Sequence, residues 1–121
     1  MPEMRFLSKI EQVAAFLRAG RRRLIAQVAE PVKVALKVRI LLYVRIDKGL
    51  PFHVDLLHRL ADQGHAAAYA EKSLHDLGMD AKRVAAYVKA EEADAWIVCA
   101  GSREILEWFA AQPVPAFALY G

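Results

Sequence analysis

Lys37-Val-Arg-Ile-Leu-Leu-Tyr-Val-Arg45 is the stretch that decides the fold. Its centre is a short apolar run, rich in β-branched and aromatic residues, with charged residues on both sides. A run of this kind is typical of a strand that is buried on both faces of a sheet. A loop is expected at residues 46–50. Pro51 then opens a helical pattern, since proline is favoured in the first helical turn. The stretch therefore predicts the first strand of a sheet.

The rest of the chain alternates between short apolar runs and helix-length amphipathic runs, which predicts βαβ units on a parallel sheet. Further strands are expected at 66–70, 95–100 and 115–120. Helices are expected from Pro51 to a stop at Gly64, from the cap Asp80 to about residue 92, and at 103–112. Right-handed crossovers and a reversal after the first pair suggest the strand order 2-1-3-4. We therefore predict an α/β fold, a Rossmann-like parallel sheet of four strands with flanking helices.

This order predicts that one face of the sheet is covered by a single helix, whose apolar stripe is expected at Val54, Leu57, Leu60 and Ala61, with Leu56 beside it. An N-terminal helix, from its cap Ser8 to about Ala19, could complete that cover. So could a second copy of the chain or a missing partner. After that helix, a short strand or extended piece at 24–28 and a linker at 30–33 are expected.

Composition limits the chain to one domain, since it has 121 residues, 56% of them hydrophobic. No run approaches the ~18 apolar residues of a membrane span, and the N-terminus has no signal-peptide pattern. A single cysteine, Cys99, fits a reducing cytoplasm. Residues 1–37 carry eight basic and three acidic residues, a net +5, whereas the remainder carries nine and eleven, a net −2. This basic arm either contacts nucleic acid or is a basic linker.

Two long stretches, Ala93 to Gly121 and Ile40-Leu-Leu-Tyr with Gly49-Leu-Pro-Phe-His-Val-Asp-Leu-Leu-His-Arg-Leu60, resemble the sensor domains of LacI/GalR-type bacterial transcription regulators. More narrowly, the chain is similar to regulators that join a GntR-like winged helix to a periplasmic-binding-protein-like sensor. The resemblance implies that residues 37–121 form the N-terminal lobe of an effector-binding domain, half of a type I periplasmic-binding-protein-like fold. Residues 1–36 would be a remnant of the DNA-binding head that lacks the helix-turn-helix.

In doubly wound sheets, ligands sit beyond the carboxyl ends of the strands, near the point where the strand order reverses. That rule places candidate ligand-binding residues along one rim of the sheet: Asp47, Leu50, Phe52, Ser73, Ser102, Arg103 and Tyr120. By the resemblance, this rim is one wall of a cleft for a sugar-like effector. Arg103 and the first N–H groups of its helix would suit an anionic or polyhydroxylated ligand. The alternative is that Ser102 only caps the helix and Arg103 is a solvated residue of its first turn.

Nucleic-acid contact, if any, is assigned to Arg18, Arg21, Arg22 and Arg23, and we expect binding to DNA only weakly or through a missing domain. We expect a homodimer and no contact with a membrane.

No metal, cofactor or catalytic group is expected. The four histidines lack a third or fourth converging ligand and are interpreted as polar-face residues. Cys99 lies in an expected buried strand, and neither a nucleotide-binding nor a nucleophile-elbow motif is present. The sequence therefore predicts an effector-sensing lobe and not an enzyme. The alternatives are a homodimeric interaction module without a ligand and, less well supported, a small hydrolase or phosphate-binding enzyme.

Overall fold

The computed structural model of the protein describes residues 12–13, 15–17 and 35–120. Its elements follow the order β1 (Lys37–Leu41), η1 (Arg45–Gly49, a 3₁₀ helix), α2 (Pro51–Asp62), β2 (Ala66–Tyr69), α3 (Ala81–Ala90), β3 (Ala95–Cys99), α4 (Arg103–Ala110) and β4 (Ala116–Leu119). The expected N-terminal helix is described only at residues 12–13 and 15–17, which are helical. The expected extended piece at 24–28 and the linker at 30–33 lie outside the described residues.

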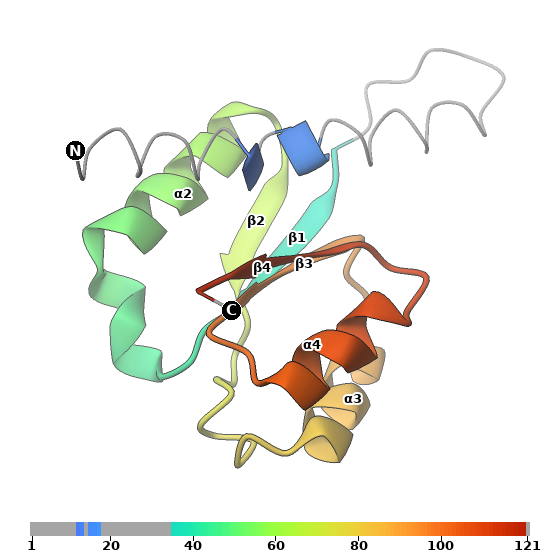
Figure 1. Ribbon diagram of the computed structural model, residues 1–121. Coiled ribbons are helices and arrows are strands. Elements are labelled where there is room, and N and C mark those ends of the chain that lie inside the picture. The colour runs from blue at the N-terminus through green and yellow to red at the C-terminus, as the bar shows by residue number, and fades with distance from the viewer. Residues whose placement is uncertain (1–11, 14, 18–34, 121) are drawn as a thin grey trace, which may run out of the picture.

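The four strands form one parallel sheet in the order β2-β1-β3-β4, which confirms the predicted fold class and strand order. Helix α2 covers one face of the sheet, and α3 and α4 cover the other (Figure 1). Strand β1 ends earlier than the opening stretch suggested, because the chain leaves the sheet after Leu41 and tightens into η1 in place of the expected loop. Gly64, at φ +87°, occupies the turn that follows α2.

Side chains of the two central strands alternate between two cores, as the period of two along a strand requires. Ile40, Ile97 and Cys99 point into the core beneath α2, while Trp96 and Val98 point into the core beneath α3 and α4. All of the cited β3 side chains are buried, so β3 is covered on both faces, as predicted from its continuous apolar sequence. In β1, Val38, Ile40 and Leu41 are buried, whereas Lys37 and Arg39 are half-buried, so the prediction of a strand buried on both faces holds only in part there.

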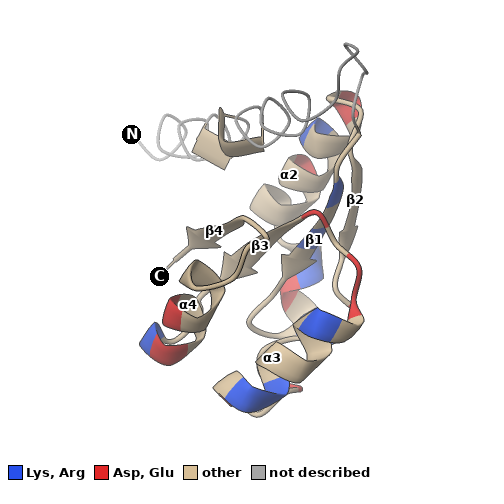
Figure 2. Ribbon diagram, turned by 90° about the vertical axis from the view of Figure 1, so that its right-hand side faces the viewer, with Lys and Arg blue, Asp and Glu red and all other residues tan. Residues whose placement is uncertain are grey.

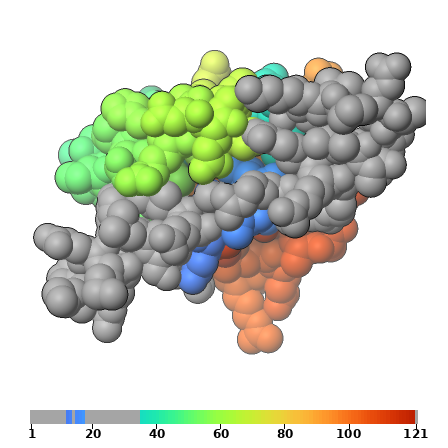
Figure 3. Space-filling view, turned by 90° about the horizontal axis from the view of Figure 1, so that it is seen from above, coloured from blue at the N-terminus to red at the C-terminus, as the bar shows by residue number. Residues whose placement is uncertain are grey.

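The face that α2 covers only in part is completed by the N-terminal helical residues. Val13 and Leu17 are buried in the same core as Ile40 and Leu119, and the ring of Phe16 lies 5.7 Å from that of Phe117. Figure 3 shows these residues, in blue, between α2 and the C-terminal elements. Of the three covers that the sequence left open, the protein's own N-terminal helix is the one the structure shows.

The apolar stripe of α2 is displaced by one residue from the one expected. Val54 and Ala61 are exposed and Leu57 is half-buried, whereas His53, Leu56 and Leu60 are buried. The interpretation of all four histidines as polar-face residues is therefore wrong for His53. It is also wrong for His65, whose Nδ1 accepts a hydrogen bond from the backbone N–H of Leu36 at 3.2 Å. The triplet 53/56/60 has helical spacing as good as that of 54/57/60/61, and only the position of the sheet decides between them.

Most charged residues lie on the helices and loops, and strand β1 carries Lys37 and Arg39 (Figure 2). Helix α3 carries Lys82, Arg83 and Lys89 and no acidic residue within its bounds. Helix α4 carries Arg103 with Glu104 and Glu107.

Candidate functional site

The strand order reverses between β1 and β3. At the carboxyl edge of the sheet, the chain leaves β1 towards one face and leaves β3 towards the other (Figure 1). Crossovers in doubly wound sheets diverge at this point and leave room for a ligand. Here η1 and the first turn of α2 follow β1, the turn at residues 100–102 follows β3, and Tyr120 follows β4. The candidate site is built from these segments.

His53, in the first turn of α2, is the buried polar centre of this edge. Its side chain is 2% exposed, and Nδ1 donates to the backbone oxygen of Asp47 at 2.8 Å. Because a carbonyl oxygen only accepts, Nδ1 carries the proton, and in the neutral form of the ring Nε2 is an acceptor. That Nε2 is buried and has no hydrogen-bond partner within the described part of the chain. Burying a polar atom unpaired costs about 1–3 kcal/mol, so this acceptor is an unusual feature of the fold.

The ring of His53 packs against the rings of Phe52 and Tyr120. The centroid of Phe52 lies 5.8 Å from that of His53, and Tyr120 lies 6.1 Å from each of the other two, all in edge-on arrangements. Such arrangements are favourable for aromatic pairs. Tyr120 is 60% exposed and its backbone has φ +59°, so a residue in a strained conformation presents its ring at the surface. The rings form an aromatic surface above a buried acceptor.

The charged groups near these rings are Asp47 and Lys48, whose Nζ lies 6.0 Å from the centroid of the Tyr69 ring. Burial, and secondarily the charge of Asp47, raises the pKa of the Cys99 thiol to about 12. Burial is also the main cause of the raised pKa of Tyr120 and of Tyr69, whose hydroxyl donates to the backbone oxygen of Lys48 at 3.1 Å. At neutral pH Cys99 is therefore a thiol and not a nucleophile, and the edge is suited to binding and not to thiolate chemistry.

The turn between β3 and α4 is tightly built. Ala100 has φ +56°, and Gly101 is closely packed, because an added Cβ would meet Cδ2 of Leu106 at 2.9 Å and Cγ1 of Val98 at 3.2 Å, so that the end of the Leu106 side chain would have to shift. Ser102 caps α4, its Oγ accepting from the N–H of Ile105 at 3.3 Å. This turn therefore fixes the path of the backbone at the site.

Two rim residues expected to bind ligand, Arg103 and Ser73, make contacts within their own segments. The Nε of Arg103 donates to Oε1 of Glu107 at 3.0 Å, and the side chain is 92% exposed. Ser73 is buried and shapes the loop after β2. Its N–H donates to Oδ2 of Asp76 at 2.8 Å, and its Oγ accepts from the N–H of Asp76 at 3.1 Å.

Asp76 also joins this loop to the candidate site. Its Oδ2 accepts from Nε of Arg45 in η1 at 2.7 Å. This bond, followed by the one from the Ser73 N–H, lowers the pKa of Asp76 to about 2. Sequence reasoning missed this pair because its members are 31 residues apart. The only local signal was the Ser-x-x-Asp spacing at 73–76, which is typical of a turn.

The structure thus brings together Asp47, Phe52 and Tyr120 of the predicted rim and adds His53, which the sequence had placed on the polar face of its helix. Leu50 is exposed at the N-cap of α2. The predicted nucleic-acid residues Arg18, Arg21, Arg22 and Arg23 lie outside the described residues.

The described residues also bear on other kinds of site. Among them, no group of three or more His, Cys, Asp or Glu side chains is placed to hold a metal ion. No helix in that part of the chain is both long and apolar enough to cross a membrane.

In comparisons with known proteins, no protein-family model, no curated protein and no solved structure matches the chain.

Proposed function

We propose that this protein is the effector-sensing N-terminal lobe of a cytoplasmic LacI-type transcription regulator, that it binds a sugar-like small molecule, and that it is not an enzyme. The observation that carries the proposal is the buried acceptor Nε2 of His53 under an aromatic surface at the carboxyl edge of the sheet. The strand order 2-1-3-4 agrees with the lobe that the sequence resemblance implies.

A sugar combines hydroxyl donors with an apolar ring face, and both have partners at this edge. A hydroxyl would donate to Nε2 of His53, and the carboxylate of Asp47 would accept from a second one. The apolar face would pack on the rings of Phe52 and Tyr120. Because Nε2 is buried, the exposed ring of Tyr120 has to shift for the ligand to reach it. In the family that the sequence resembles, effector binding closes two lobes, so this chain would supply one wall of the cleft.

The test is to titrate a panel of monosaccharides into the ¹⁵N-labelled chain and follow amide shifts of residues 47–53 and 100–102. His53→Asn keeps a donor for the Asp47 carbonyl but lacks the Nε2 acceptor, and should weaken binding by about tenfold. Tyr120→Ala should also weaken it, whereas Tyr43→Ala, which removes another exposed tyrosine outside the ring cluster, should not. A panel without a binder, or equal affinities in all variants, would overturn the proposal.

Arg18, Arg21, Arg22 and Arg23 belong to this proposal as a weak, sequence-independent contact to DNA, since basic arms bind phosphates without reading bases. We also propose that the regulator acts as a homodimer.

One observation favours the second candidate, a homodimeric interaction module without a ligand. Within the described residues, strand β4 pairs only with β3, so its outer edge is open. An apolar groove of about 180 Å³ runs beside it, lined by Val98, Leu106, Phe109, Ala110, Ala116, Phe117 and Ala118. Open strand edges are sites of pairing between chains. A stable dimer in light scattering that no sugar alters would favour this candidate, whereas a monomer would exclude it.

A further inference from the structure

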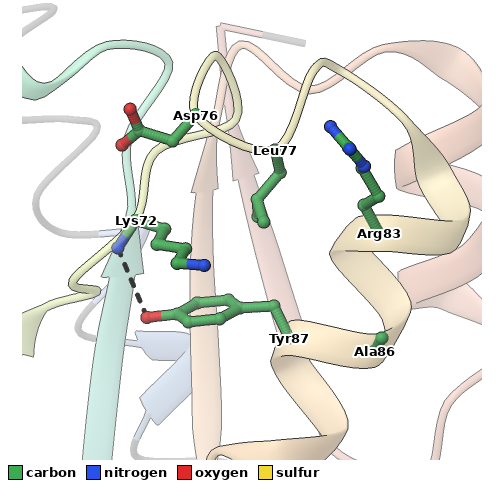
Figure 4. Close-up of a pocket in the computed structure, with 6 residues that line it drawn as sticks. All are labelled: Lys72, Asp76, Leu77, Arg83, Ala86 and Tyr87. Carbon is green, nitrogen blue, oxygen red and sulfur yellow. Dashed lines mark hydrogen bonds between the residues drawn. The ribbon is translucent and has the colours of Figure 1, made fainter.

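A second hollow lies on the other side of the sheet from α2, between the loop that follows β2 and helix α3. Its volume is about 500 Å³, within the range of small-molecule pockets. Figure 4 shows the residues that line it: Lys72, Asp76, Leu77, Arg83, Ala86 and Tyr87. None of them belongs to the ring cluster of the effector site.

The charged side chains that line this hollow are two cations, Lys72 and Arg83, and one carboxylate, while Glu71 and Glu91 outside the lining contribute to the raised pKa of Tyr87. The carboxylate of the lining, Asp76, is engaged by Arg45 and turned away from the other lining side chains (Figure 4). Lys72 and Arg83 form no ion pair with any described acidic residue, and α3 has no acidic residue within its bounds. The hollow therefore presents two cationic groups, neither of which forms an ion pair with a described carboxylate.

The two cations stand on either side of an apolar floor. Figure 4 places Lys72 and Arg83 on opposite sides of Leu77, with the ring of Tyr87 below. Leu77 is buried, and the hydroxyl of Tyr87 accepts from the backbone N–H of Glu71 at 2.9 Å, so the ring is held in place. Arg83 lies against the backbone of Gly78, where an added Cβ would meet Nη1 at 3.3 Å.

We propose that this hollow binds the phosphate monoester of a small organic molecule, at a site separate from the proposed effector site and independent of it. The phosphate would sit between the ammonium of Lys72 and the guanidinium of Arg83. Lysine binds phosphate as a point charge, and arginine binds it through a planar pair of N–H groups. Two cations match the double negative charge that a phosphate monoester carries at neutral pH. The organic group would lie on Leu77 and the ring of Tyr87, which distinguishes this ligand from inorganic phosphate.

The experiment titrates phenyl phosphate and inorganic phosphate separately into the ¹⁵N-labelled chain at constant ionic strength. We expect saturable shifts of the amides of Lys72 and Gly78, with phenyl phosphate binding more tightly than inorganic phosphate. Lys72→Met and Arg83→Met should each weaken the binding of phenyl phosphate by about tenfold. Lys72→Arg, which keeps the charge, should stay within about threefold of the wild type.

Lys82→Met is the matched control, because it removes one exposed positive charge from α3 without touching the hollow. The affinity of this variant for phenyl phosphate should differ from that of the wild type by less than about twofold. An equal loss of affinity for phenyl phosphate in Lys82→Met would show that only net charge matters, and it would overturn the site. Amide shifts that do not saturate, or that are confined to the N-terminus of α4, would overturn it as well. If Lys72→Met lowers the melting temperature, Lys72→Gln replaces it and should show the same tenfold loss. The amides of Lys72 and Gly78 lie outside the ring cluster. If they do not respond to phenyl phosphate, this proposal fails while the monosaccharide titration still tests the effector site on its own.

Discussion

Replacing Leu17 by alanine tests whether the N-terminal helix is part of the core. Leu17 is 1% exposed and packs in the core between the sheet and α2. Shortening a leucine so deeply buried removes its transfer free energy and leaves a cavity, which together cost about 3 kcal/mol. A domain of this length has roughly 6–18 kcal/mol of stability in total. The loss is therefore a large fraction of the whole and should lower the melting temperature by about 12 °C.

The assay is urea unfolding followed by circular dichroism, with Gln12→Ala as the control. Gln12 is an exposed residue of the same helix, so its replacement should change the free energy of unfolding by less than about 0.5 kcal/mol. The slope of the transition should be the same in both variants, so that the shift in midpoint reports stability alone. If Leu17→Ala costs less than about 1 kcal/mol, the helix does not cover the sheet. That face would then need a second copy or a partner.

Three further predictions follow from the turn after β3 and from the titrating groups. Ala100→Gly should raise the free energy of unfolding by up to about 1 kcal/mol, because glycine adopts a positive φ without strain. Gly101→Ala should lower the free energy of unfolding by about 1–3 kcal/mol. Thermal melts of the two variants check the sign of each change. The pKa of Asp76 is lowered to about 2, so its contribution is present above pH 4 and is lost as pH falls towards 2; Arg45→Met should flatten that part of a stability–pH curve, and an unchanged curve would contradict the bond. The pKa of the Cys99 thiol is raised to about 12, so stability should fall as pH rises from about 9 to 12, and a thiol reagent should label Cys99 at neutral pH only on unfolding.

Much of the fold was predictable because its causes are local. The continuous apolar run of β3 predicted a strand buried on both faces, and Pro51 and Asp80 predicted where two helices begin. The handedness of βαβ crossovers, together with the usual reversal after the first pair of strands, then suggested the strand order that is observed. The rim that gathers Asp47, Phe52 and Tyr120 follows from that order, because the ends of parallel strands meet at one edge.

The remainder depended on contacts between distant segments. The phase of α2 could not be read from its sequence, since two sets of positions have helical spacing and only the location of the sheet buries His53 in place of Val54. The Arg45–Asp76 bond joins two loops whose approach is set by the pairing of β1 with β2.

The sequence by itself determined the class of fold, the order of its strands and the edge where a ligand could bind. Side-chain periodicity is a property of each short segment, and crossover handedness is the same for every βαβ unit, so both can be applied to a sequence alone. Only the tertiary structure decided what covers the sheet beside α2 and which polar atom at the site is left buried without a partner among the described residues. Both outcomes depend on which side chains compete for the same buried space, and that competition exists only once the segments have packed together.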